Sequence, residues 1–143
     1  MNSSVKQVEK YNFPLFFLDI DDFKSVVDKY GHLLGTRVLK EIGETISSNL
    51  SKEDILIKYG GDEYIIILPD KSKAQAVILS ENIIRAIRES TYLKSEAEPA
   101  KVTASIGIAT YPEDAQAKKE LLILADNALF KIKSLTKNRV GTA

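Results

Sequence analysis

Short apolar stretches alternate with longer amphipathic ones along the chain. Four of the short stretches are rich in aliphatic and aromatic side chains, which is typical of buried strands. They are residues 14–20, 54–59, 63–68 and 101–111. Within the last of them, every second residue is apolar, as expected for a strand with one face against a core. The pattern therefore predicts four strands.

Three longer stretches have the periodicity of amphipathic helices, at residues 21–50, 72–90 and 112–137. In the first, Val38, Leu39, Ile42 and Ile46 share one face, after an interruption at the preceding glycines. The second follows Ser72, a favourable N-cap residue, and we expect Pro112 to open the third. Residues 139–140 predict a short final strand.

The order of these elements is strand, helix, strand, strand, helix, strand, helix. This βαββαβ core is the pattern of a ferredoxin-like palm, an α+β fold with a central antiparallel sheet flanked by helices. A single domain is expected over residues 1–143, with residues 1–13 as a polar lead-in. In such a fold the first strand lies antiparallel to the third, so Asp19 meets Asp62 and Glu63 across a distance of about 4.8 Å.

Five acids are thus expected at one edge of the sheet: Asp19, Asp21, Asp22, Asp62 and Glu63. Carboxylate oxygens bind hard cations, so the cluster predicts Mg²⁺ or Mn²⁺, and two such ions can clamp the reacting oxygens of a phosphoryl transfer. A structural interpretation stays open beside it. Asp21 and Asp22 could cap the following helix, while Asp62 and Glu63 solvate a turn.

Three lysines are candidates for phosphate contacts. Lys24 lies one turn into the first helix, whose N-terminus favours anions. Lys133 and Lys137 are four residues apart and share a helical face. The alternatives are an ordinary surface lysine for Lys24, and favourable interaction with the helix dipole for the other two.

Composition limits the function classes. The chain has 20 basic and 20 acidic residues and a formal net charge of zero, which gives no reason to expect binding to nucleic acid or to an anionic membrane. Zero cysteines and a single histidine, His32, exclude thiolate and multi-histidine metal sites within one chain. The N-terminus lacks an apolar signal core, so we expect a soluble, cytoplasmic domain.

Four segments carry a recognisable pattern: FFLDIDDFKSVVDKYGHLLGTRVL, KYGGDEY, SIGIATYPED and ADNALFKIKSLTKNRV, which lie within residues 16–140. In order and spacing they resemble the GGDEF family of nucleotidyl cyclases, and the resemblance covers roughly residues 14–140. The resemblance implies a palm-like fold and the condensation of two GTP into cyclic di-GMP on an antiparallel homodimer. The 3′-hydroxyl of each nucleotide attacks the α-phosphorus of the other and expels pyrophosphate.

The resemblance also implies roles for individual residues. Asp19, the Ile20 carbonyl, Asp62 and Glu63 match the metal-binding positions, and the three acids are the expected catalytic residues. The expected nucleotide-binding residues are Asp22, Phe23, Lys24, Val27, Thr36, Gly60, Gly61, Lys133 and Lys137. Mg²⁺ or Mn²⁺ is the expected cofactor, and a purine nucleoside triphosphate is the expected substrate.

The sequence departs from the family pattern where guanine is read. Family members commonly have asparagine and aspartate where this chain has Val27 and Thr36. Each unmatched polar contact costs about 1–3 kcal/mol, so base choice is expected to be relaxed or shifted. Lys137 stands where an arginine is usual. The regulatory RxxD motif would run from Ser51 to Asp54, and its arginine is missing.

Three functions therefore remain open. The first is a nucleotidyl cyclase that acts as a homodimer. The second is a catalytically degenerate GGDEF module that binds a nucleotide or a partner and acts in regulation. The third is a minimal CRISPR-type polymerase that makes an adenine cyclic dinucleotide; this resemblance is weaker, because the C-terminal half reads as an ordinary GGDEF domain.

Overall fold

The computed structural model describes residues 12–143, so most of the predicted lead-in lies outside the described residues. Five strands form one sheet in the order β2-β3-β1-β4-β5. They are β1 (Phe13–Ile20), β2 (Ile55–Lys58), β3 (Glu63–Ile67), β4 (Ala104–Tyr111) and β5 (Val140–Thr142). β1 pairs antiparallel with both β3 and β4, whereas β5 joins β4 in parallel. The predicted palm-like α+β fold is confirmed.

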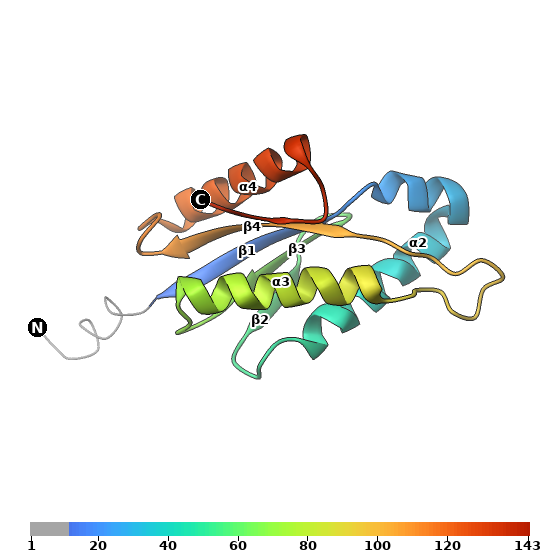
Figure 1. Ribbon diagram of the computed structural model, residues 1–143, viewed down its shortest axis with the longest axis horizontal. Helices are drawn as coiled ribbons and strands as arrows, with labels where there is room; N and C mark the ends of the chain where they lie inside the picture. The colour runs from blue at the N-terminus through green and yellow to red at the C-terminus, as the bar shows by residue number, and fades with distance from the viewer. Residues whose placement is uncertain (1–11) are drawn as a thin grey trace, which may run out of the picture.

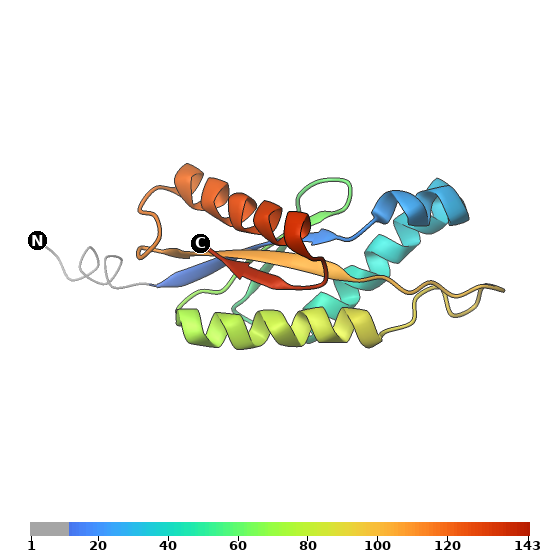
Figure 2. The ribbon, with the colours of Figure 1, turned by 45° about the horizontal axis from the view of Figure 1, so that its top comes forward.

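Three helices cover the two faces of this sheet: α2 (Phe23–Ser48), α3 (Lys73–Glu89) and α4 (Lys118–Leu135). The helices α2 and α3 lie on one face and α4 lies on the other (Figures 1 and 2). Side chains of β1 alternate between the two cores. Phe16 and Leu18 pack on the side of α2 and α3, while Leu15 and Phe17 pack on the side of α4. Asp19, one residue before the end of β1, continues the second series and contacts Lys133 of α4.

A glycine lets α4 lie close to the sheet. A Cβ atom at Gly107 in β4 would overlap the α4 backbone at Ala125 and Leu129. Because the helix sits directly on the strand here, its later residue Lys133 is held near the end of β1. The close approach therefore helps to position a cation over the acidic edge.

Some helix boundaries could be predicted from the local sequence and others could not. Ser72 caps α3 in a capping box with Gln75, as the sequence indicates. The helix α2 is kinked at Gly31, whose φ is 86°. The prediction that Pro112 opens the last helix was wrong. The carboxylate of Asp114 accepts a hydrogen bond from the Thr110 backbone, which closes a turn, and α4 begins only at Lys118.

No helix formed by residues 12–143 combines the length and the apolar character that crossing a lipid bilayer requires.

Candidate functional site

The strand register brings two of the predicted acids together. Asp19 lies directly opposite Glu63 in the β1–β3 pair, and the Ile20 amide donates to the Asp62 carbonyl over 3.2 Å. The side chains of Asp19 and Asp62 are close enough to share a hydrogen bond. The C-terminal end of β1 therefore meets the tip of the β2–β3 hairpin, as the order of elements predicts.

Asp19 is a poorly satisfied carboxylate. Its side chain is 21% exposed, and Lys133 Nζ lies 3.2 Å from Oδ2. The other oxygen, Oδ1, is buried and has no hydrogen-bond partner among residues 12–143. Burial, and then the neighbouring Asp62, raise the pKa of Asp19 to about 7, although Lys133 acts in the opposite direction. Such a group binds a proton or a cation more readily than an ordinary aspartate does.

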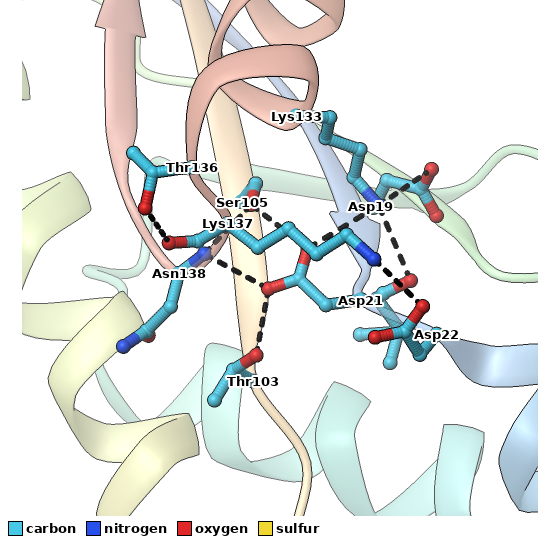
Figure 3. Close-up of polar contacts among 10 residues, drawn as sticks. Asp19, Asp21, Asp22, Thr103, Ser105, Lys133, Thr136, Lys137 and Asn138 are labelled. Carbon is cyan, nitrogen blue, oxygen red and sulfur yellow. Dashed lines mark hydrogen bonds and ion pairs between the residues drawn. The ribbon is translucent and has the colours of Figure 1, made fainter.

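Asp21, two residues further along the chain, accepts hydrogen bonds on both of its carboxylate oxygens. Thr103 Oγ1 and Ser105 Oγ donate to its two oxygens over 2.7 and 2.8 Å, and the Asn138 amide donates over 3.0 Å. Lys133 Nζ lies 3.3 Å from Oδ1, so this lysine bridges Asp19 and Asp21. Figure 3 shows Asp21 at the centre of these contacts, with Lys133 between it and Asp19. We call Asp21, Thr103, Ser105 and Asn138 the Asp21 network. Asp21 is therefore a structural anchor, and it does not cap α2.

The third acid of the predicted metal site, Glu63, contacts the hairpin backbone. The Glu63 carboxylate rests against the backbone of Gly60, where a Cβ atom would overlap it. Lys58 folds over the same hairpin and donates to the carbonyls of Gly60 and Gly61. Within residues 12–143 no three acidic or histidine side chains are grouped so as to hold a metal ion. The placement of five acids at one edge of the sheet as a metal site therefore stays a prediction, and the contacts of Asp22 and Glu63 are with Lys137 and Gly60.

The donor set nevertheless fits a hard cation. Asp19 offers an unpartnered buried oxygen, Asp62 lies beside it, and the Ile20 carbonyl points to the same region, where Lys133 Nζ lies 3.4 Å away. All of these are oxygen ligands, which Mg²⁺ and Mn²⁺ prefer. Glu63 is the next residue along the strand after Asp62.

The remaining charged candidates lie at the start of α2. Asp22 occupies the N-cap position with φ of 52°, but its side chain makes no capping bond. Instead it accepts a hydrogen bond of 2.7 Å from Lys137, which holds the pKa of Asp22 below its usual range and raises the pKa of Lys137. Phe23 packs against the core. Lys24 is exposed and forms no ion pair with a carboxylate of the described residues.

The two altered positions lie on α2, and Thr36 borders the hairpin. A cavity of about 590 Å³ lies between the helix and the hairpin, lined by Thr36, Lys40, Lys58 and Gly61 among others. The Thr36 hydroxyl donates to the His32 carbonyl within its own helix over 3.0 Å. Val27 packs against Gly35, one turn away from this cavity. Val27 offers no acceptor, and Thr36 offers one hydroxyl oxygen in place of the paired acceptors that suit the donor edge of guanine.

Sequence reasoning missed three residues that hold the acidic edge in place, namely Thr103, Ser105 and Asn138. A signal for one of them was present. Ser105 is a polar residue within an otherwise apolar strand, on the side opposite Ala104 and Ile106. Asn138 is less obvious, because it acts through its backbone amide.

A family model described as "Diguanylate cyclase, GGDEF domain" matches residues 1–139. The chain belongs to the GGDEF family. In this GGDEF chain the signature reads Gly60-Gly61-Asp62-Glu63-Tyr64. The Tyr64 hydroxyl donates to the Leu39 carbonyl of α2, so the aromatic residue ties the hairpin to the helix. Burial raises the pKa of this hydroxyl.

Curated relatives and solved structures agree with this assignment. The chain is 39% identical over 126 residues to the bifunctional diguanylate cyclase/cyclic di-GMP phosphodiesterase MucR of Pseudomonas aeruginosa, covering 88% of the chain and 18% of MucR. It is 34% identical over 140 residues to diguanylate cyclase A of Treponema denticola, covering 98% of the chain and 37% of that protein. The chain thus spans well under half the length of these relatives.

Among solved structures, the GGDEF domain of PA1120 from Pseudomonas aeruginosa superposes with a TM-score of 0.91 at 30% identity, covering 98% of this chain and 87% of that one. The GGDEF domain of DgcB from Caulobacter crescentus, in complex with c-di-GMP, gives a TM-score of 0.86 at 25% identity, with coverage of 98% and 84%. The GGDEF assignment therefore rests on sequence and on fold together.

Proposed function

We propose that this GGDEF domain is a nucleotidyl cyclase that condenses two purine nucleoside triphosphates into a cyclic dinucleotide. The observation that carries the proposal is the proximity of the Asp19 and Asp62 side chains, with a buried Asp19 oxygen that has no hydrogen-bond partner among residues 12–143. A carboxylate in this condition is costly to the folded chain. Its presence is explained if the site takes a cation during function.

Asp19, Asp62 and the Ile20 carbonyl would hold Mg²⁺ or Mn²⁺, with Glu63 as a further ligand or as the acceptor of the substrate hydroxyl proton. A bound divalent ion supplies neutralisation of the triphosphate charge. Lys133 lies at the same edge and contributes a positive charge, and Lys24 and Lys137 are placed to contact phosphates at the start of α2. In the reaction, a bond forms between the 3′-oxygen and the α-phosphorus while the bond to pyrophosphate breaks.

Each chain supplies one such edge, whereas a cyclic product needs two phosphodiester bonds. We therefore propose that two copies face one another during turnover, each presenting one bound nucleotide. Product formation per unit of protein is expected to rise steeply with protein concentration, because dimers increase with the square of the monomer concentration.

Base choice is proposed to be weaker than in a strict GTP enzyme. The cavity beside the hairpin offers ammonium donors, from Lys40 and Lys58, and no carboxylate lines it. The N1 and N2 groups of guanine are donors and need acceptors, which Val27 and Thr36 do not supply. The acceptor edges of purines, by contrast, can be met by lysine donors.

The test is to incubate the protein with Mg²⁺ or Mn²⁺ and with each nucleoside triphosphate, singly and in pairs. Products are identified by mass spectrometry, and pyrophosphate release is measured over a range of protein concentrations. We expect a cyclic dinucleotide and pyrophosphate, both abolished by Asp62→Ala. Absence of both at high protein concentration would reject the cyclase.

A second candidate is a GGDEF module that binds a nucleotide without turnover. The observation that favours it is the loss of the paired guanine acceptors at positions 27 and 36, together with the contact of the Glu63 carboxylate with Gly60. Calorimetry separates the two functions. Metal-dependent binding of a nucleoside triphosphate, with no product over many hours, would support the binding module.

A further inference from the structure

Three of the four arginines of the chain line one cleft that shares Lys137 with the candidate active site. The cleft has a volume of about 610 Å³ and lies between α3 and the turn that joins α4 to β5. Arg85 and Arg88 face it from α3, and Arg139 faces it from the turn. A cavity of this size is in the usual range for small-molecule sites.

The charge in this cleft is strongly unbalanced. Besides the three arginines, Lys137 lines it, and Glu81 is the one carboxylate among its lining residues. None of the three arginines forms an ion pair with a carboxylate of residues 12–143, whereas Arg37, the fourth, pairs with Glu41 and Glu96. The chain as a whole has no net charge. The excess of positive charge is therefore a local property of this cleft.

A helix dipole does not account for this arrangement. Arg88 lies in the last turn of α3, where a cation is favourable. Arg139, however, comes from a different element and is brought to the same cleft by the fold. Arg85 donates to the Asn82 side chain over 3.1 Å, which leaves most of its donors free. Planar guanidinium groups that line one cleft from two elements suit the several oxygens of a phosphate chain.

Asn138 connects the wall of the cleft to the Asp21 network. In Figure 3 the Asn138 side chain points away from Asp21, while its backbone amide holds that carboxylate. Asn138 thus has its backbone in the Asp21 network and its side chain among the residues that line the cleft.

We propose that this cleft binds a small oligophosphate, either free pyrophosphate or the phosphate chain of a nucleotide, through Arg85, Arg88 and Arg139. The site is separate from the Asp19–Asp62 pair, and its binding needs no metal. The turn that carries Arg139 also carries the Asn138 amide, which binds Asp21, and the Lys137 side chain, which binds Asp22. A ligand in the cleft would therefore hold this turn in place beside the two acids. The proposal holds whether or not the chain is a cyclase.

The test is isothermal titration calorimetry in EDTA and about 150 mM salt, where surface charge is screened over about 8 Å. Sodium pyrophosphate and GTP are titrated separately into the wild type and four variants. The first replaces Arg85, Arg88 and Arg139 by alanine, and the second replaces them by lysine. The third, a matched control, removes three exposed lysines elsewhere (Lys52, Lys119 and Lys131, each to alanine). The fourth is Lys24→Ala, at the candidate active site.

We expect pyrophosphate to bind the wild type, the surface-lysine control and Lys24→Ala with equal affinity. The arginine-to-alanine variant should bind at least tenfold more weakly, and the lysine variant should be intermediate, since it keeps the charge but loses the paired donors. Tighter binding of GTP than of pyrophosphate would identify a nucleotide as the ligand, and equal binding would identify the phosphate chain alone.

The proposal is overturned if the wild type binds neither compound without metal, if the arginine-to-alanine variant binds as the wild type does, or if Lys24→Ala removes the binding. Circular dichroism of each variant establishes that it is folded, and these exposed side chains lie outside the hydrophobic core. Since turnover is not the readout, failure of the cyclase proposal would leave this result unchanged, and the reverse also holds.

Discussion

Asp19 and Asp21 are two residues apart, yet their surroundings differ in every respect that matters for function. Asp21 is buried and accepts three hydrogen bonds from the Asp21 network, in addition to its contact with Lys133. Asp19 has one oxygen on Lys133, one buried oxygen without a partner, and a second acid beside it. A saturated carboxylate has no capacity left for a ligand, whereas an unsaturated one does. Asp21 therefore supports the structure of the site, whereas Asp19 is available to bind a ligand.

The largest expected effect is on stability at Asp21. Replacing Asp21 by alanine leaves the Thr103 and Ser105 hydroxyls without their carboxylate acceptor, and it leaves the Asn138 amide with Ser105 Oγ alone. Breaking a buried charged network of this kind costs about 3–5 kcal/mol. We expect the free energy of unfolding, measured by urea denaturation, to fall by that amount.

The matched control for Asp21→Ala is Asp22→Ala. Its carboxylate is 66% exposed and contacts a single exposed lysine, so its loss should change stability little. Equal effects of the two substitutions would show that the Asp21 network is not an anchor.

Replacing Asp19 should change the free energy of unfolding in the opposite direction from replacing Asp21. Its pKa is about 7 in the folded protein against the ordinary 3.8, so the unfolded chain loses the proton first as the pH rises. Ionisation therefore destabilises the fold progressively from about pH 4, by about 1.4 kcal/mol per pH unit, and the penalty is complete above about pH 7. Asparagine resembles the neutral acid. Asp19→Asn should raise the free energy of unfolding at pH 8 by about 2–4 kcal/mol while it abolishes product formation.

Urea denaturation of Asp19→Asn in EDTA at pH 5 and pH 8 checks the direction of this pH dependence. The gain at pH 8 should exceed the gain at pH 5 by about 2 kcal/mol. Asp126→Asn is the control, because Asp126 is exposed and unpaired among the described residues. A gain from Asp19→Asn that does not depend on pH would mean that the carboxylate is not strained by its burial.

The sequence was sufficient to predict the meeting of Asp19 with Asp62, because strand order and antiparallel pairing fix backbone positions. It was not sufficient to place Glu63, whose direction depends on side-chain torsions at the hairpin. The ion pairs of Lys133 with Asp19 and Asp21 were also not predicted. The spacing of Lys133 from Lys137 indicates a shared helical face, but only the close approach of α4 at Gly107 brings it over two acids. The Asp21 network depends on a backbone amide more than 100 residues away, at Asn138. No local pattern encodes such a contact.

A smaller effect concerns base choice. Val27→Asn and Thr36→Asp together restore the two acceptor-bearing residues that the GGDEF resemblance places at the guanine edge. Each restored contact is worth about 1–3 kcal/mol, so the preference for GTP over ATP should rise about 10- to 100-fold per contact. The measurement is kcat/KM for each nucleotide with the single and double variants. An unchanged ratio of kcat/KM for GTP to that for ATP would mean that the base does not contact positions 27 and 36.

The smallest effect separates the two glycines of the hairpin, which differ in what surrounds them. A methyl group at Gly60 would meet the Glu63 carboxylate, whereas one at Gly61 would enter open space. Because Glu63 is the flexible partner in that contact, Gly60→Ala should displace its carboxylate at little cost in stability. We expect kcat to fall about tenfold, equivalent to about 1.4 kcal/mol, with KM for the nucleotide unchanged. Gly61→Ala provides the matched control and should retain wild-type kcat. If both substitutions reduce kcat equally, the hairpin acts through backbone freedom, and the position of Glu63 beside Gly60 has no part in the reaction.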